Sequence, residues 1–544
     1  MPVVRVSIPR LAKMVGVERK RLIDRIPYVG LDIEGVDGDI LRVEYSPNRP
    51  DFGTDYGIAR ALRGLLGVET GLPTYTAKSS GLTVSYDRRL GKVRPFIACA
   101  TATGLGLDEE DVRQLISLQE DLHNGIGRKR RVLAIGLHDM DAVRPPLRYG
   151  AVPSTFRFRP LGSSKSMSVK DVLSETHEGR SYGGYFGGSA LFPMIQDSEG
   201  TVLSFPPVIN GDATRVTSKT KSLFVDVTGT SMEAGDDAVA ILATTLAEMG
   251  GSIGTVKVLY PKGTRTTPDL SPVKIPLDLE LVRSNTGLDL TRRQVVECLG
   301  RSRMGTKGDW ALGPRYRVDL IHPVDVAEEV ALGYGIDKIG PLYPASKQPG
   351  QFNRFEEFLD AASTVMAGSG MIELMTYELI DEKTLYSNFQ RDQKDKISVQ
   401  NPRTIEHSIL RDSVFPSLMT SLSANVKSEY PQRLFEIGRV FARKGGRVSE
   451  SWRLGCVVAH SQASFSEAKM YLESAVRVLS GMDTKTTPSS HWAFSEGRTG
   501  EVQVGNAPVG VVGEVRPGVI EAFGLRVPVS GFEVDLSVIH ELLK

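Results

Sequence analysis

Cysteine is scarce in this sequence, and the few cysteines are far apart. Cys99, Cys298 and Cys456 are the only three among 544 residues, and none belongs to a CxxC or Cys/His pattern. A disulfide scaffold or a structural zinc site needs such residues in closely spaced sets. The sequence therefore argues against both. It is typical of a protein in a reducing compartment, which predicts a cytoplasmic location.

Long apolar segments are missing as well. A membrane-spanning helix needs about 18 or more consecutive apolar residues, and no such run occurs. The first residues, MPVVRVSIPRLAKMVGV, include charged side chains where a secretory signal would be apolar. We expect neither a membrane span nor a signal peptide.

Neither sign of charge is in excess, because 66 Lys and Arg residues stand against 65 Asp and Glu residues. A protein that binds nucleic acid over most of its surface is usually strongly basic. We therefore expect no DNA partner, and RNA contact only through local patches. The segment Gly127–Arg131, GRKRR, is one such patch; a solvated turn before the strand VLAIGL is the alternative.

The chain is too long for one core, and it mixes strand-like and helix-like patterns throughout. The stretches TAKSSGLTVS, TRTTPDLSP and PLYPASKQPG read as boundaries because they are polar or rich in proline and glycine. We predict a multidomain α+β protein. Its parts are an N-terminal domain at 1–75, a larger α+β domain at 85–265, a small helical, winged-type module at 273–345 and an antiparallel-sheet domain at 350–544.

One stiff loop precedes a predicted helix in the N-terminal domain, within Tyr45–Gly64, YSPNRPDFGTDYGIARALRG. Its two prolines restrict themselves and the residues before them to extended conformations. Asp51 or Thr54 then caps an amphipathic helix. We interpret the loop as a rigid connector, in which Asn48 and Arg49 contact the chain's own domains rather than RNA.

Several segments, in this order, resemble the β subunit of phenylalanyl-tRNA synthetases in its archaeal and eukaryotic-cytosolic form. They are SPNRPDFGTDYGIARALRG, PPVINGDATRVTSKTKSLFVDVTGT, YRVDLIHPVDVAEEVALGYGIDKI, VQNPRTIEHSILRDSVFPSLM, RLFEIGRVF and VGEVRPGVIEAFGL. The resemblance covers nearly the whole chain. It implies a partner of a catalytic α subunit in an (αβ)2 heterotetramer that binds tRNA(Phe) and uses ATP in the α subunit.

The resemblance also implies an editing pocket in the 85–265 domain that hydrolyses mischarged Tyr-tRNA(Phe). A pocket for phenylalanine rejects an added hydroxyl by only roughly 100-fold, so fidelity calls for a second site. The matching polar residues here are Ser204, Asn210, Asp226 and Thr228. Asp226 and Thr228 alternate along one predicted strand and so share a face. The alternative is that these two merely finish a strand and cap the next helix.

No Ser-His-Asp or Cys-His nucleophile arrangement is evident in the sequence. His138 and Asp139 are adjacent on a predicted strand and face opposite ways, so they do not form an acid/base pair. We therefore expect attack on the ester by water, positioned by the polar groups of the pocket.

Four acids, Asp319, Asp325, Glu328 and Glu329, cluster around a predicted helix start. Capping explains Asp325 as the N-cap and Glu328 at the third helical position, but it leaves Asp319 unexplained. Oxygen ligands suit Mg²⁺, and the resemblance implies Mg²⁺ at these positions. Helix capping and a magnesium site both stay open here.

The 350–544 domain resembles the class II synthetase catalytic fold but lacks the cations that hold ATP phosphates there. The near match at 353–356, NRFE, lies on the opening helix, and GEVRPG is not followed by a glycine-rich helix with an arginine. We expect a scaffold in which Arg411, Asn425 and Glu436 hold strands and a partner interface. A purely structural subunit without editing activity, or a free-standing aminoacyl-tRNA deacylase, are the alternatives.

Overall fold

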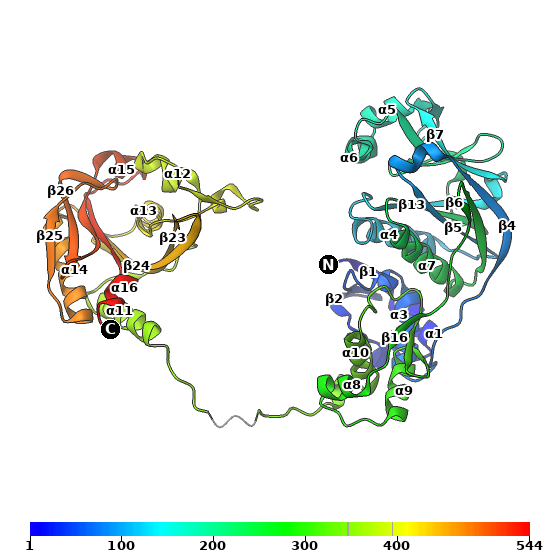
Figure 1. Ribbon diagram of the computed structural model, residues 1–544, viewed down its shortest axis with the longest axis horizontal. Coiled ribbons are helices and arrows are strands. Elements are labelled where there is room, and N and C mark those ends of the chain that lie inside the picture. The colour runs from blue at the N-terminus through cyan, green and yellow to red at the C-terminus, as the bar shows by residue number, and fades with distance from the viewer. Residues whose placement is uncertain (345–347, 394) are drawn as a thin grey trace. The chain divides into compact units, whose positions relative to one another are not determined.

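The computed structural model describes residues 1–344, 348–393 and 395–544 and contains two compact units, Met1–Tyr343 and Pro344–Lys544 (Figure 1). Helices and strands are mixed in both units, which confirms the α+β multidomain class. Each predicted domain range contains one main sheet, although the largest sheet runs from Ala77 to Thr267 and so exceeds 85–265. The predicted join at 341–350 includes residues 345–347, which lie outside the described part.

The N-terminal domain consists of a three-stranded sheet covered by helices. Its core consists of aliphatic side chains and two aromatic ones, Tyr45 and Phe52. Thr54, rather than Asp51, caps the following helix, because its hydroxyl accepts a hydrogen bond from the backbone N–H of Gly57. The elements are β1 (Val3–Ser7), α1 (Ile8–Val15), α2 (Arg19–Arg25), β2 (Asp32–Asp37), β3 (Ile40–Glu44) and α3 (Asp55–Leu65).

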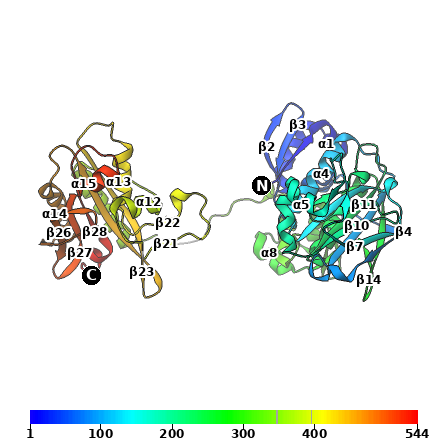
Figure 2. The ribbon, with the colours of Figure 1, turned by 90° about the horizontal axis from the view of Figure 1, so that it is seen from above.

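The second domain is a ten-stranded sheet with two long helices, α4 (Glu109–Asn124) and α7 (Met232–Glu248), packed on one face (Figure 1). The other face carries a second apolar core, formed by side chains of the strands themselves. Neighbouring strands of this sheet lie side by side in Figure 2. Along the sheet the order is β12 (Ile209–Asn210), β11 (Val202–Phe205), β10 (Leu191–Gln196), β7 (Leu147–Pro153), β4 (Ala77–Tyr86), β14 (Ser252–Tyr260), β5 (Phe96–Thr103), β13 (Ser222–Gly229) and β6 (Leu133–Asp139), with β15 (Gly263–Thr267) on β14. Strands β11 and β6, from opposite ends of this order, approach each other.

The small module combines three helices with a three-stranded antiparallel sheet, all within residues 273–334. Its apolar core is separate from those of the two preceding domains. The elements are β16 (Val273–Pro276), α8 (Leu279–Thr286), α9 (Arg292–Arg301), β17 (Gly305–Lys307), β18 (Trp310–Gly313) and α10 (Pro323–Tyr334). The assignment to the winged type stays a prediction.

A buried ionic network connects these three parts of the first unit. The Arg60 guanidinium, on α3, lies 3.5 Å from the ring centre of Tyr316 in the small module. Its terminal nitrogens lie 3.3 Å from Asp51 and 3.8 Å from Glu248 of α7. Burial opposes ionisation of Asp51, but Arg49 and Arg60 lower the pKa of this carboxyl below its ordinary value. The charges are therefore compensated where they are most desolvated.

The stiff loop belongs to this network. Arg49 makes two hydrogen bonds to Asp51, at 2.9 and 3.0 Å, and its guanidinium lies 3.9 Å from the ring centre of Phe52. Arg49 therefore contacts its own chain, as expected, within the loop itself. The Asn48 side chain makes no hydrogen bond to a described residue, and the exclusion of RNA from this loop stays a prediction. The loop fixes the Asp51 carboxylate in place beneath α3.

In the second unit the described residues form a seven-stranded sheet with helices on both faces. Arg411 and Glu436 are both buried and form an ion pair of 2.7 Å, so they hold strands together as expected. The sheet order is β19 (Ile372–Glu373), β23 (Gln432–Lys444), β24 (Arg447–Ala459), β28 (Val529–Asp535), β27 (Ala507–Val515), β26 (Phe494–Val504) and β25 (Thr484–Pro488). Helices α11 (Arg354–Gly368), α14 (Phe465–Ser480) and α16 (Leu536–Glu541) cover one face, and α13 (Phe415–Ala424) covers the other.

Two glycines of the sheet, Gly455 and Gly531, face the start of helix α13. A Cβ atom at Gly455 would lie 2.4 Å from the Val414 side chain, and one at Gly531 would lie 2.8 Å from Phe415. Glu533, from the central strand β28, accepts hydrogen bonds from the first backbone N–H groups of this helix, at 3.0 and 3.1 Å. Helix α13 therefore covers part of this face, and a pocket of about 200 Å³ lies beside the start of the helix, with Arg391, Trp492 and Glu533 in its lining.

Loss of Arg60 should weaken the first unit. We expect Arg60→Met to lower the free energy of unfolding by about 3–5 kcal/mol, because it leaves buried Asp51 without one of its cations. Calorimetry of the full chain measures this, with Arg21→Met, at an exposed position on α2, as the control. If Arg60→Met had the same melting temperature as the Arg21→Met control, the network would be energetically neutral.

His491 should make the second unit sensitive to acid. Burial, together with Arg391 and Arg516, lowers the pKa of His491 to about 4. Between this value and the ordinary one, only the unfolded chain takes up the proton, so stability falls as pH drops. We expect His491 to account for about 2–3 kcal/mol of the stability lost between pH 7 and 4.5. His491→Gln should reduce the loss, and His177→Gln, at an exposed position, should not.

Candidate functional site

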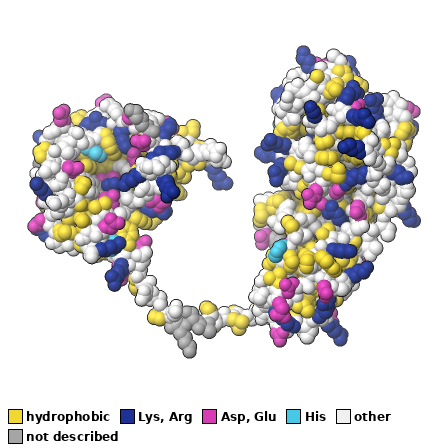
Figure 3. Space-filling model, in the orientation of Figure 1, with side chains coloured by type: hydrophobic (Ala, Val, Ile, Leu, Met, Phe, Trp, Pro, Cys, Tyr) yellow, Lys and Arg dark blue, Asp and Glu magenta, His cyan; other side chains and the backbone are white. Residues whose placement is uncertain are grey.

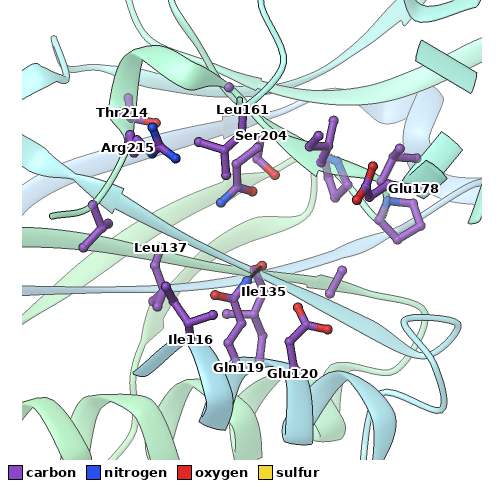
Figure 4. Close-up of a pocket in the computed structure, with 18 of the residues that line it drawn as sticks. Ile116, Gln119, Glu120, Ile135, Leu137, Leu161, Glu178, Ser204, Thr214 and Arg215 are labelled. Carbon is purple, nitrogen blue, oxygen red and sulfur yellow. Dashed lines mark hydrogen bonds between the residues drawn. The ribbon is translucent and has the colours of Figure 1, made fainter. Parts of the chain in front are cut away.

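The first unit contains a pocket of about 350 Å³ where strands β6 and β11–β12 of the large sheet approach each other. Figure 4 shows its two sides. Gln119 and Glu120 project from α4 on one side, and Ser204 and Leu161 lie on the other. The lining combines apolar side chains with several polar and charged ones, and a pocket with convergent polar groups is a candidate ligand site.

Two of the four predicted editing residues, Ser204 and Asn210, line this pocket. They are neighbours because β11 and β12 pair in antiparallel register, with Ser204 directly opposite Asn210. Ser204 is 3% exposed and Asn210 is half-buried, and neither side chain makes a hydrogen bond to any described residue. Both polar groups are therefore free to bind a ligand in the pocket.

An ionised carboxylate, Glu120, lies across the pocket from Ser204 (Figure 4). Burial tends to raise its pKa, but hydrogen bonds from His123 and Arg130 lower the pKa of Glu120 below its ordinary value. The distances are 3.2 Å to His123 Nδ1 and 2.7 Å to Arg130. Because His123 Nε2 accepts the backbone N–H of Ile135, the proton of this imidazole is on Nδ1 and points at Glu120.

The basic segment predicted as an RNA patch forms a left-handed turn at the pocket. Arg128, Lys129 and Arg130 have φ angles of 46°, 56° and 65°, which cost roughly 1–2 kcal/mol for each non-glycine residue. Arg130 points inward, 3.1 Å from the carbonyl of Val208 and 4.6 Å from the ring centre of Tyr182. Arg128 and Lys129 are exposed. Strain of this kind is frequent at functional sites.

The other two predicted residues, Asp226 and Thr228, share one face of β13 as expected, but they are fully buried and do not line the pocket. Thr228 accepts a hydrogen bond of 2.9 Å from Arg94 Nε, and the same guanidinium contacts the carbonyl of Arg130 at 3.4 Å. Burial lowers the pKa of Arg94 to about 10. Thr228 thus lies behind the basic turn, to which Arg94 connects it.

His138 is the partner of Asp226, and sequence reasoning missed it. Its Nε2 lies 2.7 Å from Asp226 Oδ2, and its Nδ1 lies 2.8 Å from the hydroxyl of Thr214. In the sequence, His138 stands next to Asp139, with which it was predicted to form no pair. The true partner comes from the adjacent strand, where Asp226 pairs with Gly136. The only available signal was the glycine at position 136, which leaves room for the two side chains.

The four predicted magnesium ligands are near one another, but three of them already have protein partners. Arg317 binds Asp319 through two hydrogen bonds, at 2.8 and 2.7 Å, and Glu329 at 2.5 Å. Asp325 accepts the backbone N–H groups of residues 321 and 322. Glu328 is exposed. Among the described residues, no group of three or more His, Cys, Asp or Glu side chains is arranged to hold a metal. This arrangement does not fit Mg²⁺.

The predicted capping of this helix was partly wrong. Helix α10 begins at Pro323, and His322, not Asp325, is its N-cap. Asp325 occupies the third helical position of a capping box with His322, so Glu328 lies one turn further on. The proline at the first helical position, which needs no N–H donor, sets this start.

The surface agrees with the balanced charge of the sequence. Lys and Arg side chains are interspersed with acidic, apolar and neutral ones on the visible face of each unit (Figure 3). Across the described ranges, none of the helices has the length and apolar character that crossing a bilayer requires. All three cysteines are described, buried and free of disulfides.

Comparison with known families gives the class of the protein. Residues 275–336 match the family described as "tRNA synthetase B5 domain", and residues 339–536 match "Phenylalanyl tRNA synthetase beta chain CLM domain". The first unit is similar to the crystal structure of an N-terminal fragment of the phenylalanyl-tRNA synthetase β subunit from Pyrococcus horikoshii. That match has a TM-score of 0.59 and 35% identity, and it covers 61% of this chain and 99% of the fragment. The domains are those of an aminoacyl-tRNA synthetase subunit.

Full-length relatives give the particular family. The chain is 40% identical to the phenylalanine–tRNA ligase β subunit of Archaeoglobus fulgidus, with 99% of each chain covered. It is 35% identical to that of Methanococcoides burtonii, over 99% of this chain and 100% of the relative. With Thermococcus kodakarensis the identity is 37%, over 91% and 90%. The chain belongs to the family of phenylalanine–tRNA ligase β subunits, of the archaeal type, which confirms the resemblance.

Magnesium should have no stabilising effect on this chain. Because Arg317 already neutralises Asp319 and Glu329, we expect millimolar Mg²⁺ to leave the melting temperature of the full chain unchanged relative to EDTA. Arg317→Met would free the two carboxylates and serves as the positive control for ion binding. A rise in melting temperature with Mg²⁺ in the unmutated chain would contradict this expectation.

Proposed function

We propose that this chain is the editing subunit of its synthetase and that the pocket beside β11–β12 hydrolyses Tyr-tRNA(Phe). The observation that carries the proposal is the pair of unpartnered polar side chains, Ser204 and Asn210, facing an ionised Glu120 across a pocket large enough for an aromatic amino acid. In this assignment the α subunit joins phenylalanine to tRNA(Phe) with ATP and Mg²⁺, and the β chain removes tyrosine.

Selection of tyrosine needs a polar group that phenylalanine leaves unpaired. The Ser204 hydroxyl meets this requirement because it is buried, lines the pocket and has no partner among the described side chains. A site built around such a group can reject the analogue that lacks the hydroxyl by about 10⁴-fold. Asp226 and Thr228 contribute from behind the wall, through His138 and Arg94.

The polar side chains of the pocket suit water attack on an ester. Glu120, held ionised by His123 and Arg130, accepts a hydrogen bond from the attacking water and orients it. The Asn210 amide donates to the ester oxygen on which negative charge develops. Water adds to the carbonyl carbon, the bond to the tRNA ribose oxygen breaks, and that oxygen leaves as a hydroxyl with the proton lost by the water.

The mouth of the pocket suits the end of a tRNA. Four exposed cations without ion-pair partners in the described chain lie on the basic turn and beside the pocket: Arg128, Lys129, Arg131 and Arg215. Phosphate contacts position RNA without reading its sequence, which suffices to deliver a charged 3′ end. DNA is not included among the proposed partners.

The second unit is proposed to bind the α subunit in an (αβ)2 heterotetramer. Met375, Tyr377 and Ile405 are 97%, 77% and 81% exposed, which is unusual for large apolar side chains. Tyr377 contacts His407, close to Ile405, so two of these side chains are near each other. Exposed apolar groups of this kind indicate an interface.

Removal of the free polar groups should abolish editing but not aminoacylation. We expect Asn210→Ala to slow hydrolysis of Tyr-tRNA(Phe) by about 10²–10³-fold in the complex with the α subunit, as for loss of one charge-stabilising donor. Ser204→Ala should mainly reduce the preference for tyrosine over phenylalanine. Release of tyrosine from charged tRNA is the measurement.

Ser218→Ala, at an exposed position of the same domain, is the control, and Phe-tRNA(Phe) synthesis reports on intact assembly. If the unmutated complex released no tyrosine above the spontaneous rate, the chain would be a structural subunit only. Activity of the chain without α would instead favour a free-standing deacylase.

A further inference from the structure

Three buried side chains, Asp226, His138 and Thr214, form a hydrogen-bonded row that leads from the interior of the large sheet to the pocket wall. His138 and Asp226 are fully buried, and Thr214 is 1% exposed but contributes to the lining. The two contacts of His138 are 2.7 and 2.8 Å long. Both lie within the normal range for hydrogen bonds that involve these atoms.

The direction of these hydrogen bonds follows from the chemistry of the groups. A carboxylate only accepts, so His138 Nε2 carries the proton that Asp226 Oδ2 receives. In the neutral ring Nδ1 is then an acceptor, and the Thr214 hydroxyl donates to it. Asp226 thus fixes the tautomer of His138, and His138 fixes the rotamer of Thr214.

Local sequence makes room for this row. Gly136 lies opposite Asp226 in the strand pairing, two residues before His138 on β6. A Cβ atom at position 136 would lie 2.1 Å from Asp226 Oδ2 and 2.5 Å from His138 Nε2. Only glycine at this position allows the carboxylate and the imidazole to meet. The contact between His138 and Asp226 therefore depends on the sequence and pairing of these two strands.

The order hydroxyl, imidazole, carboxylate is that of a hydrolase triad, but the placement differs. In a triad the hydroxyl is presented to the substrate and gives its proton to the imidazole during attack. Here the Thr214 side chain is almost completely covered, and its hydroxyl points at His138 behind the wall. We therefore assign no nucleophilic role to Thr214.

The position of Thr214 in the chain suits the row to fixing the pocket wall in place. Thr214 is the last residue of the short helix η6 (Asp212–Thr214), which is separated from Asn210 by Gly211 and is followed by Arg215. Asn210 and Arg215 both line the pocket. We propose that His138 is a positioning residue that fixes the Asn210–Arg215 segment from within the sheet, with Asp226 as its anchor. This inference rests on the proposed editing function, since it concerns the geometry of that pocket.

The test removes the hydrogen bond between Thr214 and His138, which is the one nearest the pocket. Thr214→Val removes the hydroxyl while keeping the shape of the side chain and the His138–Asp226 contact. We expect kcat for Tyr-tRNA(Phe) hydrolysis by the complex with the α subunit to fall at least tenfold, with KM changed less than threefold. Thr214→Ser, which restores the hydroxyl, should recover most of the rate. Thr217→Val, on the surface two residues after Arg215, is the matched control.

A double-mutant cycle shows whether the two residues act together. In His138→Gln the amide nitrogen replaces Nε2, so the contact with Asp226 is kept and the contact with Thr214 is lost. Each single variant should therefore have the same defect, and the double variant Thr214→Val/His138→Gln should be no slower than either. Additive losses would show that His138 and Thr214 act independently and would overturn the proposal.

Two further outcomes are distinguishable. If the unmutated complex hydrolyses Tyr-tRNA(Phe) and Thr214→Val does so at the same rate, the positioning role is wrong while the editing function stands. If the unmutated complex releases no tyrosine, the editing function itself is wrong. Phe-tRNA(Phe) synthesis and the melting temperature, measured on every variant, separate misfolding from a local defect in the pocket.

Discussion

Arg60 is buried where three parts of the first unit meet, and its charge has to be balanced at that point. Asp51 comes from the stiff loop, Glu248 from the helix that covers the large sheet, and Tyr316 from the small module. An isolated charge of this kind would cost several kcal/mol. The three parts therefore keep their relative placement, and the pocket of the large sheet is carried on a rigid support.

The pocket also depends on buried polar contacts that fix the segments around it. Three elements of its wall are each held by a buried group behind them. His123 holds Glu120, Arg94 holds the basic turn, and His138 holds the segment after Asn210. Preorganised polar groups cost no reorganisation when charge develops on a substrate. The strained backbone at the basic turn is tolerated because these contacts over-determine it.

Much of the fold could be predicted from the sequence because its signals are local. Alternating apolar residues predict strands, and the loop prolines with Thr54 define the start of α3. The candidate site was less predictable, since it depends on strand register. Asp226 meets His138 only because β13 pairs with β6 in one particular alignment, which no local pattern encodes. The acids near residue 319 were predicted as metal ligands for a similar reason: Arg317 was not recognised as their common partner.

Helix α13 lies against the sheet of the second unit through glycines that leave no space for a side chain. A larger side chain at either glycine would push the helix away from the sheet and pull the backbone N–H groups at its start off the Glu533 carboxylate. Two positions without a side chain therefore decide whether a buried carboxylate keeps its backbone donors.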